Sequence, residues 1–250
     1  MTTSAPVPAL DRDMIARLRA DVIASSWTTD TLDELLSDGA LSALMRDSRL
    51  PALVELAGVD APAATLTRFF IGGQPERASA LDAALPTLGA AGLETLGLAA
   101  TIDEDEAASA LVMPRPCSKS APKRERAQAG EGEEASFPTA PALPTMRDPD
   151  EEPEPEVVVD PWMRALYDLR PHAAALPGGE HEWWVTSDLG EGQTGKPLAD
   201  HHVMGIGGAT RTLLEMTVRD QVDSALDVGC GCGIQALYLA THARRVVATD

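Results

Sequence analysis

Aromatic residues and cysteines are scarce in this chain of 250 residues, and long apolar runs are absent. Only 4% of the residues are Phe, Trp or Tyr, so we expect a core built mostly from Ala, Leu and Val. Three cysteines do not form the pattern of a disulfide framework. No apolar run approaches the ~18 residues of a membrane span, and the first residues do not resemble a signal peptide. These absences predict a cytoplasmic protein with no membrane partner.

Basic residues are also few, since 20 Lys and Arg stand against 39 Asp and Glu and give a formal net charge of −19. The charge is −10 in residues 1–112, +4 in 113–130, −9 in 131–160 and −4 in 161–250. Proteins that hold nucleic acid through its phosphates usually present a Lys/Arg face. The charge pattern therefore argues against strong nucleic-acid binding by these residues.

The middle of the chain, residues 113–160, has the composition of a linker. It is rich in Pro, Glu, Ala and Ser, and a basic block at 115–126 precedes an acidic one. Such a segment cannot bury enough apolar surface to offset the entropy lost on ordering. We predict a disordered, charged linker. Its basic block is either a weak nucleic-acid or targeting patch or an ordinary solvated loop.

Residues 1–112 have the pattern of a helical domain with about six helices. The first, over residues 11–26, is expected to begin at a cap formed by Asp11 or Asp13. Residues 101–116 favour a β-hairpin with an acidic turn at 103–106, so the domain is either winged-helix-like or a generic helical domain. The residues at helical spacing on one face of the first helix are Met14, Ile15, Leu18, Val22 and Ile23.

Residues 161–250 begin with a pattern of two strands around a Pro-Gly-Gly turn at 177–179. Trp183 and Trp184 are neighbours in the second strand, so we expect them to face opposite sides. Core packing is favoured for them over stacking on a base or substrate. A glycine-rich stretch then leads into a helix that we expect from about Ala209 to Val218.

The chemistry is concentrated in "ALDVGCGCGIQALYLATHARRVVATD", residues 225–250. A short apolar strand contains Asp227, glycines follow at 229, 231 and 233, and a helical stretch leads to a second strand that ends in Asp250. Glycines permit a tight turn and let backbone N–H groups approach a ligand. An acid after the second strand can accept hydrogen bonds from ribose hydroxyls. The pattern predicts a β-α-β nucleotide site.

The glycine spacing separates two classes of ligand. A dinucleotide site has the spacing Gly-x-Gly-x-x-Gly, which would require a glycine at position 234. Here the spacing is Gly-x-Gly-x-Gly, and position 234 is Ile. The pattern Asp-x-Gly-x-Gly-x-Gly resembles motif I of class I S-adenosylmethionine-dependent methyltransferases. The upstream stretch 201–218 resembles the "methyltransferase small" group, which includes release-factor glutamine and rRNA guanine methyltransferases. The resemblance implies an S-adenosyl-L-methionine site formed by Asp227, Gly229, Cys230, Gly231, Gly233, Asp250 and Thr210, with Gly208 beside it.

Two other features of this region have alternative explanations. Cys230 and Cys232 are spaced like metal ligands, but no second cysteine pair follows. We expect them to be small residues required by a tight loop, with no metal bound. His201 and His202 are either bases or ordinary loop residues.

The resemblance implies a Rossmann-like domain whose enzyme methylates a nitrogen of a protein glutamine or of a nucleic-acid base by direct displacement. A complete domain of that group has seven strands and an Asn-Pro-Pro-aromatic motif that holds the substrate, and neither is present. We therefore expect a fragment of a longer enzyme that is itself inactive, with no catalytic residue of its own. The alternatives are an NAD(P)-dependent oxidoreductase and a non-catalytic helical interaction module with a degenerate nucleotide fold. We therefore expect three parts: a helical domain over residues 1–112, a charged linker over 113–160, and a β-ribbon with the first β-α-β unit of an incomplete methyltransferase domain over 161–250.

Overall fold

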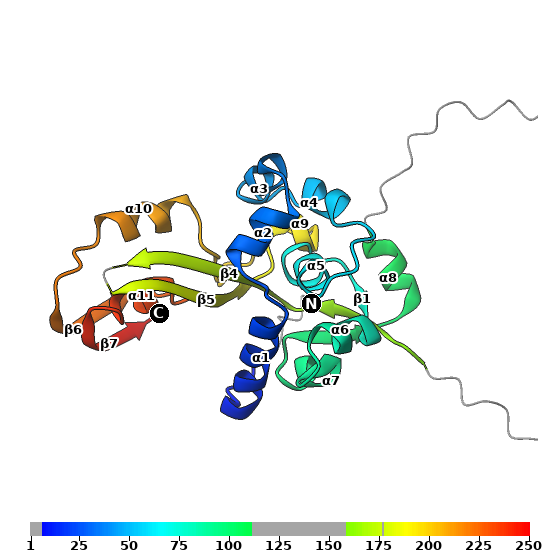
Figure 1. The fold of residues 1–250 in the computed structure, drawn as a ribbon, viewed down its shortest axis with the longest axis horizontal. Coiled ribbons are helices and arrows are strands. Elements are labelled where there is room, and N and C mark those ends of the chain that lie inside the picture. Colours follow the sequence, from blue (N-terminus) through cyan, green and yellow to red (C-terminus); the bar gives the residue numbers. More distant parts are fainter. Residues whose placement is uncertain (1–6, 112–158, 177) are drawn as a thin grey trace, which may run out of the picture. The chain divides into compact units, whose positions relative to one another are not determined.

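The structure is a computed structural model, and it describes residues 7–111, 159–176 and 178–250 (Figure 1). Nearly all of the predicted linker, residues 113–160, lies outside the described residues. The chain before it and the chain after it belong to one compact unit. The described part has a mixed α/β fold, with a helical region first and small sheets with helices after it. No helix within it has both the length and the apolar character needed to cross a membrane.

The N-terminal region is helical as predicted, and side chains cap several of its helices. Asp11 accepts hydrogen bonds from the backbone N–H groups of Asp13 and Met14, both at 3.0 Å, and so begins the first helix. Thr28 and Ser37 cap the next two. The helices are α1 (Arg12–Ala24), α2 (Thr29–Leu35), α3 (Asp38–Leu44), α4 (Leu50–Glu55), α5 (Pro62–Leu66), the π-helix η1 (Thr67–Ile71), α6 (Ala78–Ala84) and α7 (Gly89–Thr95).

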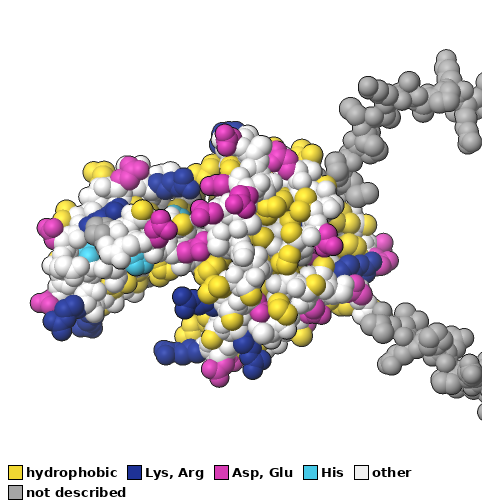
Figure 2. Space-filling model, in the orientation of Figure 1, with side chains coloured by type: hydrophobic (Ala, Val, Ile, Leu, Met, Phe, Trp, Pro, Cys, Tyr) yellow, Lys and Arg dark blue, Asp and Glu magenta, His cyan; other side chains and the backbone are white. Residues whose placement is uncertain are grey.

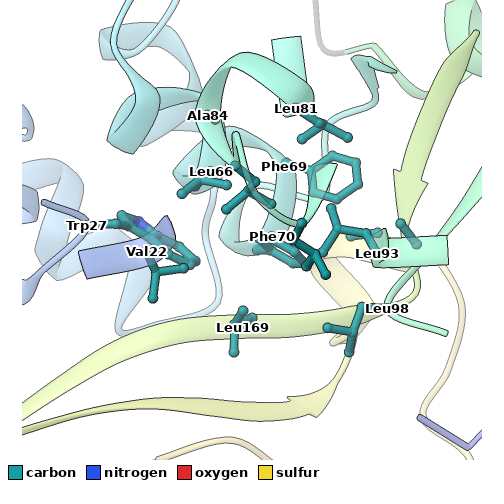
Figure 3. Packing of buried hydrophobic residues seen from close by; sticks show 14 of the residues in the cluster. Val22, Trp27, Leu66, Phe69, Phe70, Leu81, Ala84, Leu93, Leu98 and Leu169 are labelled. Carbon is teal, nitrogen blue, oxygen red and sulfur yellow. The ribbon is translucent and has the colours of Figure 1, made fainter. Parts of the chain in front are cut away.

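Three of the nine aromatic residues, Trp27, Phe69 and Phe70, lie in the core of this region (Figure 3). Trp27 and Phe70 stack with ring centroids 5.8 Å apart, and Phe69 meets Phe70 edge-on at 4.9 Å. The indole N–H of Trp27 donates to Thr67 Oγ1 at 2.9 Å, so the buried polar atom of this ring is satisfied. Leu169 lies in the same core, which residues on both sides of the 112–158 segment therefore share.

A three-stranded antiparallel sheet also joins the two parts of the chain. Its strands are β1 (Glu76–Arg77), β2 (Ala99–Ile102) and β3 (Trp162–Ala165), in the order β1-β3-β2. The predicted hairpin over 101–116 is wrong, because β2 leads into a helix, α8 (Glu104–Ala110). Asp103 caps that helix by accepting from the N–H of Glu106 at 2.7 Å. The acidic residues expected in a turn fill its first turn, where negative charge is favoured.

The predicted pair of strands around the Pro-Gly-Gly turn is confirmed. It forms a hairpin of β4 (Tyr167–Leu176) and β5 (Gly179–Asp188) in unbroken register. The two adjacent tryptophans face opposite sides, as expected. Trp184 packs against the N-terminal core and donates its indole N–H to the carbonyl oxygen of Trp27 at 2.8 Å. Trp183 packs beside Tyr238 in a second cluster. A single turn, α9 (Glu191–Thr194), follows.

The last elements form the predicted β-α-β unit. The helix α10 (Gly208–Met216) precedes β6 (Val222–Val228), α11 (Ile234–Leu239) and β7 (Ala243–Thr249), and β6 and β7 pair in parallel. Leu214 of α10 and Ile234 of α11 pack against Val185 of the hairpin. This cluster places the start of α11, and with it the end of the glycine loop, beside the hairpin.

Candidate functional site

The loop between β6 and α11 is held in a conformation that only glycine adopts readily. Gly229, Gly231 and Gly233 have φ angles of +72°, +47° and +77°. A Cβ atom placed on any of the three would meet no heavy atom within 4 Å. The backbone conformation therefore accounts for the glycines, and the space beside the loop is open to a ligand. The N–H groups of Gly229 and Cys230 both donate to the carbonyl oxygen of Thr249, at 2.8 and 3.0 Å, which ties the loop to the end of β7.

Asp227, near the end of β6, has an unusual environment. Asp227 is only 8% exposed. Among the described residues, its Oδ2 is the one buried side-chain oxygen or nitrogen that has no hydrogen-bond partner. A buried charged oxygen without a partner is costly, because it has lost its water and gained nothing in return. Such a group calls for a partner, which can be an ordered water, an ion or a ligand.

A cleft of about 590 Å³ opens beside the glycine loop. Gly229, Cys230 and Gly231 form one wall, and Asp250 lies at the same opening. Its volume falls in the range of small-molecule sites, roughly 300–1,000 Å³. Ala209, Thr210 and Leu213 of α10 line the facing wall.

Two hydrogen-bonded contacts shape the walls of this cleft. Gln235 of α11 donates its side-chain amide to the carbonyl oxygen of Thr210 at 3.2 Å and so couples the two helices. Asp188, at the end of β5, accepts from the N–H of Val203 at 2.8 Å. The same carboxylate oxygen lies 3.8 Å from Nδ1 of His202. The hairpin end thereby fixes the loop that carries His201 and His202 into the lining of the cleft.

Most of the predicted site residues therefore meet in one place. The cleft brings together Thr210, Gly229, Cys230, Gly231 and Asp250. Three others do not line it. Asp227 is buried in β6 below the loop, Gly233 ends the loop before α11, and Gly208 begins α10.

Sequence reasoning missed the part of the cleft formed by the loop before α10. His201, His202 and Met204 line the cleft, as does Gln235. The two histidines were expected to be either bases or ordinary loop residues, and the structure places both at the site. The available signal was the glycine-rich stretch around them, but their position depends on the contact with Asp188, which no local pattern reveals.

A polar contact behind the cleft connects α11 to the hairpin. Nε2 of His172 lies 2.9 Å from the hydroxyl of Tyr238, and Trp183 packs beside both rings. Burial, followed by the positive charge of Arg211, lowers the pKa of His172. Burial raises the pKa of Tyr238. At neutral pH both groups are therefore uncharged, which suits a partly buried contact.

Cys230 and Cys232 are partly exposed free thiols. Within the described ranges, no three His, Cys, Asp or Glu side chains are grouped so that they could hold a metal ion.

Comparison with known proteins places only the N-terminal region. Residues 24–110 match a family model described as "Domain of unknown function (DUF7059)". The match runs from the end of α1 to the end of α8 and does not include the glycine loop. Searches of curated proteins and of solved structures found no match to this chain.

Proposed function

We propose that this chain carries part of the cofactor site of an S-adenosylmethionine-dependent methyltransferase. The observation that supports this most is the buried, unpartnered Oδ2 of Asp227 directly below a loop of three glycines with positive φ. A pyrophosphate-containing dinucleotide would be repelled by a carboxylate at that position. A ligand whose bound half carries an ammonium and a sulfonium would be attracted by it.

The residues present fit this cofactor. The glycine loop leaves open space where side chains would otherwise stand, and the cleft of about 590 Å³ has room for a nucleoside with an amino-acid tail. The glycine loop would hold the methionine half, with the buried carboxylate of Asp227 behind it, and Asp250 would hold the ribose hydroxyls. Thr210 and Gln235, which are joined by a hydrogen bond, would line the rest of the pocket with the loop.

The proposed reaction is the methylation of a nitrogen of a protein glutamine or of a nucleic-acid base. S-adenosylmethionine supplies a methyl group on a sulfonium, which a nucleophilic nitrogen displaces directly. The residues of this chain contribute binding and orientation. Asp227 provides negative charge to the cationic half, and the walls of the cleft exclude water from part of it.

The cofactor site of this chain is proposed to be partial. The sheet of β6 and β7 has two strands, and it leaves Leu226, Val228 and Val247 at 62%, 75% and 38% exposure. Two parallel strands covered by one short helix are unfavourable alone. We therefore expect weak binding, with a dissociation constant of about a millimolar, or about −4 kcal/mol, and no methyl transfer by this chain.

Ligand-observed saturation-transfer NMR tests this proposal, because it detects weak binding. The expected result is transfer from the protein to S-adenosylmethionine, and competition by S-adenosylhomocysteine. NADH serves as the control ligand. The Asp227→Asn variant should lose the signal, whereas Asp223→Asn, an exposed position on the same strand, should keep it.

Two outcomes would count against the proposal. Stronger saturation transfer to NADH than to S-adenosylmethionine would favour an oxidoreductase. No transfer to either ligand, in a chain shown by circular dichroism to be folded, would favour a helical interaction module with a degenerate nucleotide fold.

A further inference from the structure

The outer edge of the β4–β5 hairpin has backbone groups that no other strand uses. The hairpin is a two-stranded sheet, so β5 pairs with β4 on one side only. Asp188 shows which residues point outward, because its N–H donates to the carbonyl oxygen of Val203, away from β4, at 3.0 Å. Along an antiparallel strand the outward and inward residues alternate, and the register is unbroken. The outward residues are therefore Glu180, Glu182, Trp184 and Thr186.

These outward backbone groups have no partner within the described part of the chain. Apart from the bond at Asp188, no backbone hydrogen bond beyond the ladder with β4 reaches β5. Pro171, which faces Trp184 across the ladder, agrees with this assignment, since a residue without an N–H fits a pair that exchanges no hydrogen bonds. An edge of unpaired N–H and C=O groups is a template for another extended chain.

An apolar cleft of about 410 Å³ lies along this edge. Glu182, Trp184 and Thr186, three of the four outward residues, line it together with Trp183. Ile15 and Leu18 of α1 line it as well. An extended chain on β5 would thus place alternate side chains in an apolar cleft, which is the usual source of specificity in strand addition.

The lining of this cleft includes a cation without an ion-pair partner, although the protein is acidic overall. Arg19 of α1 lines the cleft, and in the described residues it forms no ion pair. Glu182 lines the cleft as well, and its carboxylate accepts a hydrogen bond from the N–H of Thr29 at 3.3 Å. Figure 2 shows dark-blue side chains around the position of α1 in Figure 1. Charges beyond a Debye length of about 8 Å are largely screened, so Arg19 can attract a carboxylate in spite of the net charge of −19.

We propose that β5 and α1 form a docking site for an extended peptide that carries apolar side chains and a carboxylate. The peptide pairs with the outward backbone groups of β5, places its apolar side chains between Trp184 and α1, and its carboxylate pairs with Arg19. This interaction is separate from the glycine loop and does not depend on methyl transfer.

Hydrogen exchange and calorimetry on the whole chain test this site. The probe is the peptide acetyl-Thr-Val-Thr-Val-Thr-Asp-Thr-amide. Binding should slow exchange of the N–H groups of Glu182, Trp184 and Thr186 and leave those of Trp183 and Val185 unchanged. The same peptide with Lys in place of Asp should bind about fivefold more weakly. The same peptide with N-methylated backbone should bind at least about tenfold more weakly.

Two matched pairs of variants locate the site. Arg19→Glu should weaken binding about fivefold, whereas Arg17→Glu, which makes the same charge change outside the cleft, should not. Thr186→Pro removes one outward donor and leaves the ladder with β4 intact, so binding should fall about tenfold. Thr186→Ala keeps the donor and should bind as the wild type does.

Three results would overturn the proposal. One is the absence of peptide binding by the wild-type chain. This measurement stands whether or not the Thr186→Pro variant folds. Another is an affinity for the peptide that N-methylation of the peptide backbone leaves unchanged. The third is slowed exchange of the same β5 amides at high protein concentration without peptide, which would mean that a second copy of this chain occupies the edge.

Discussion

Replacing Asp227 by Asn should make the protein more stable, although most substitutions of buried residues destabilise. Asp227 is only 8% exposed as a residue, and its buried Oδ2 has no hydrogen-bond partner among the described residues. Burying an unsatisfied polar group costs about 1–3 kcal/mol, and a charged one more. Asn has nearly the same shape and no charge, so the variant avoids part of that cost.

The expected gain in the free energy of unfolding is about 1 kcal/mol, the lower end of that range. For a unit of this size it corresponds to a rise in Tm of roughly 2–4 °C. The assay is thermal unfolding followed by circular dichroism at neutral pH, without any ligand. Asp223→Asn on the same strand is the matched control. Asp223 is exposed and pairs with Arg244 at 3.0 Å, so its loss should change stability by less than about 0.5 kcal/mol.

A fall in Tm would refute the reasoning. A decrease of several degrees in Asp227→Asn would show that the carboxylate has structural partners in the folded chain. It would then not be a group held for a ligand, and the argument for the cofactor site would lose its main support.

Three further predictions concern the rest of the described fold. Asp21→Ala should lower the free energy of unfolding by about 3 kcal/mol, because the buried carboxylate accepts hydrogen bonds from the N–H groups of Thr87 and Leu88 before α7. Urea unfolding measures this loss, and Asp33→Ala at an exposed position is the control. Gly231→Ala should cost about 1 kcal/mol through its φ of +47° alone. Gly39→Ala, inside α3 and without a positive φ, should not destabilise, and a large loss in both variants would contradict this reasoning. Because burial lowers the pKa of His172 in the folded chain, stability should be full above the ordinary value of about 6.5 and fall as the pH drops below it. Urea unfolding between about pH 7.5 and pH 5 should therefore show a weaker pH dependence in His172→Gln, and equal slopes in both proteins would contradict this.

The features that could be predicted from the sequence are those that local patterns determine. Glycines at 229, 231 and 233 between an acid-bearing apolar strand and a helical stretch predicted the β-α-β unit, and its parallel pairing is confirmed. The tryptophan neighbours and the Pro-Gly-Gly turn predicted the hairpin and its two faces. In each case the residues that decide the structure lie within one short segment.

The features that could not be predicted depend on contacts between distant segments. β2 pairs with β3 across the 112–158 segment, so residues 99–102 gave no sign that their partner follows a long charged stretch. The acidic residues after β2 were interpreted as a turn, but Asp103 caps a helix instead. The positions of His201 and His202 depend on the end of β5. Local spacing contains none of this information.

The cofactor site can be located by photochemical crosslinking of S-adenosylmethionine to this chain and mapping of the labelled peptide. The label is expected within residues 227–235 or at Asp250, S-adenosylhomocysteine should compete for it, and Asp227→Asn should lose it. Label placed elsewhere in the chain, or an equal loss of label with NADH as competitor, would show that this loop is not an S-adenosylmethionine site.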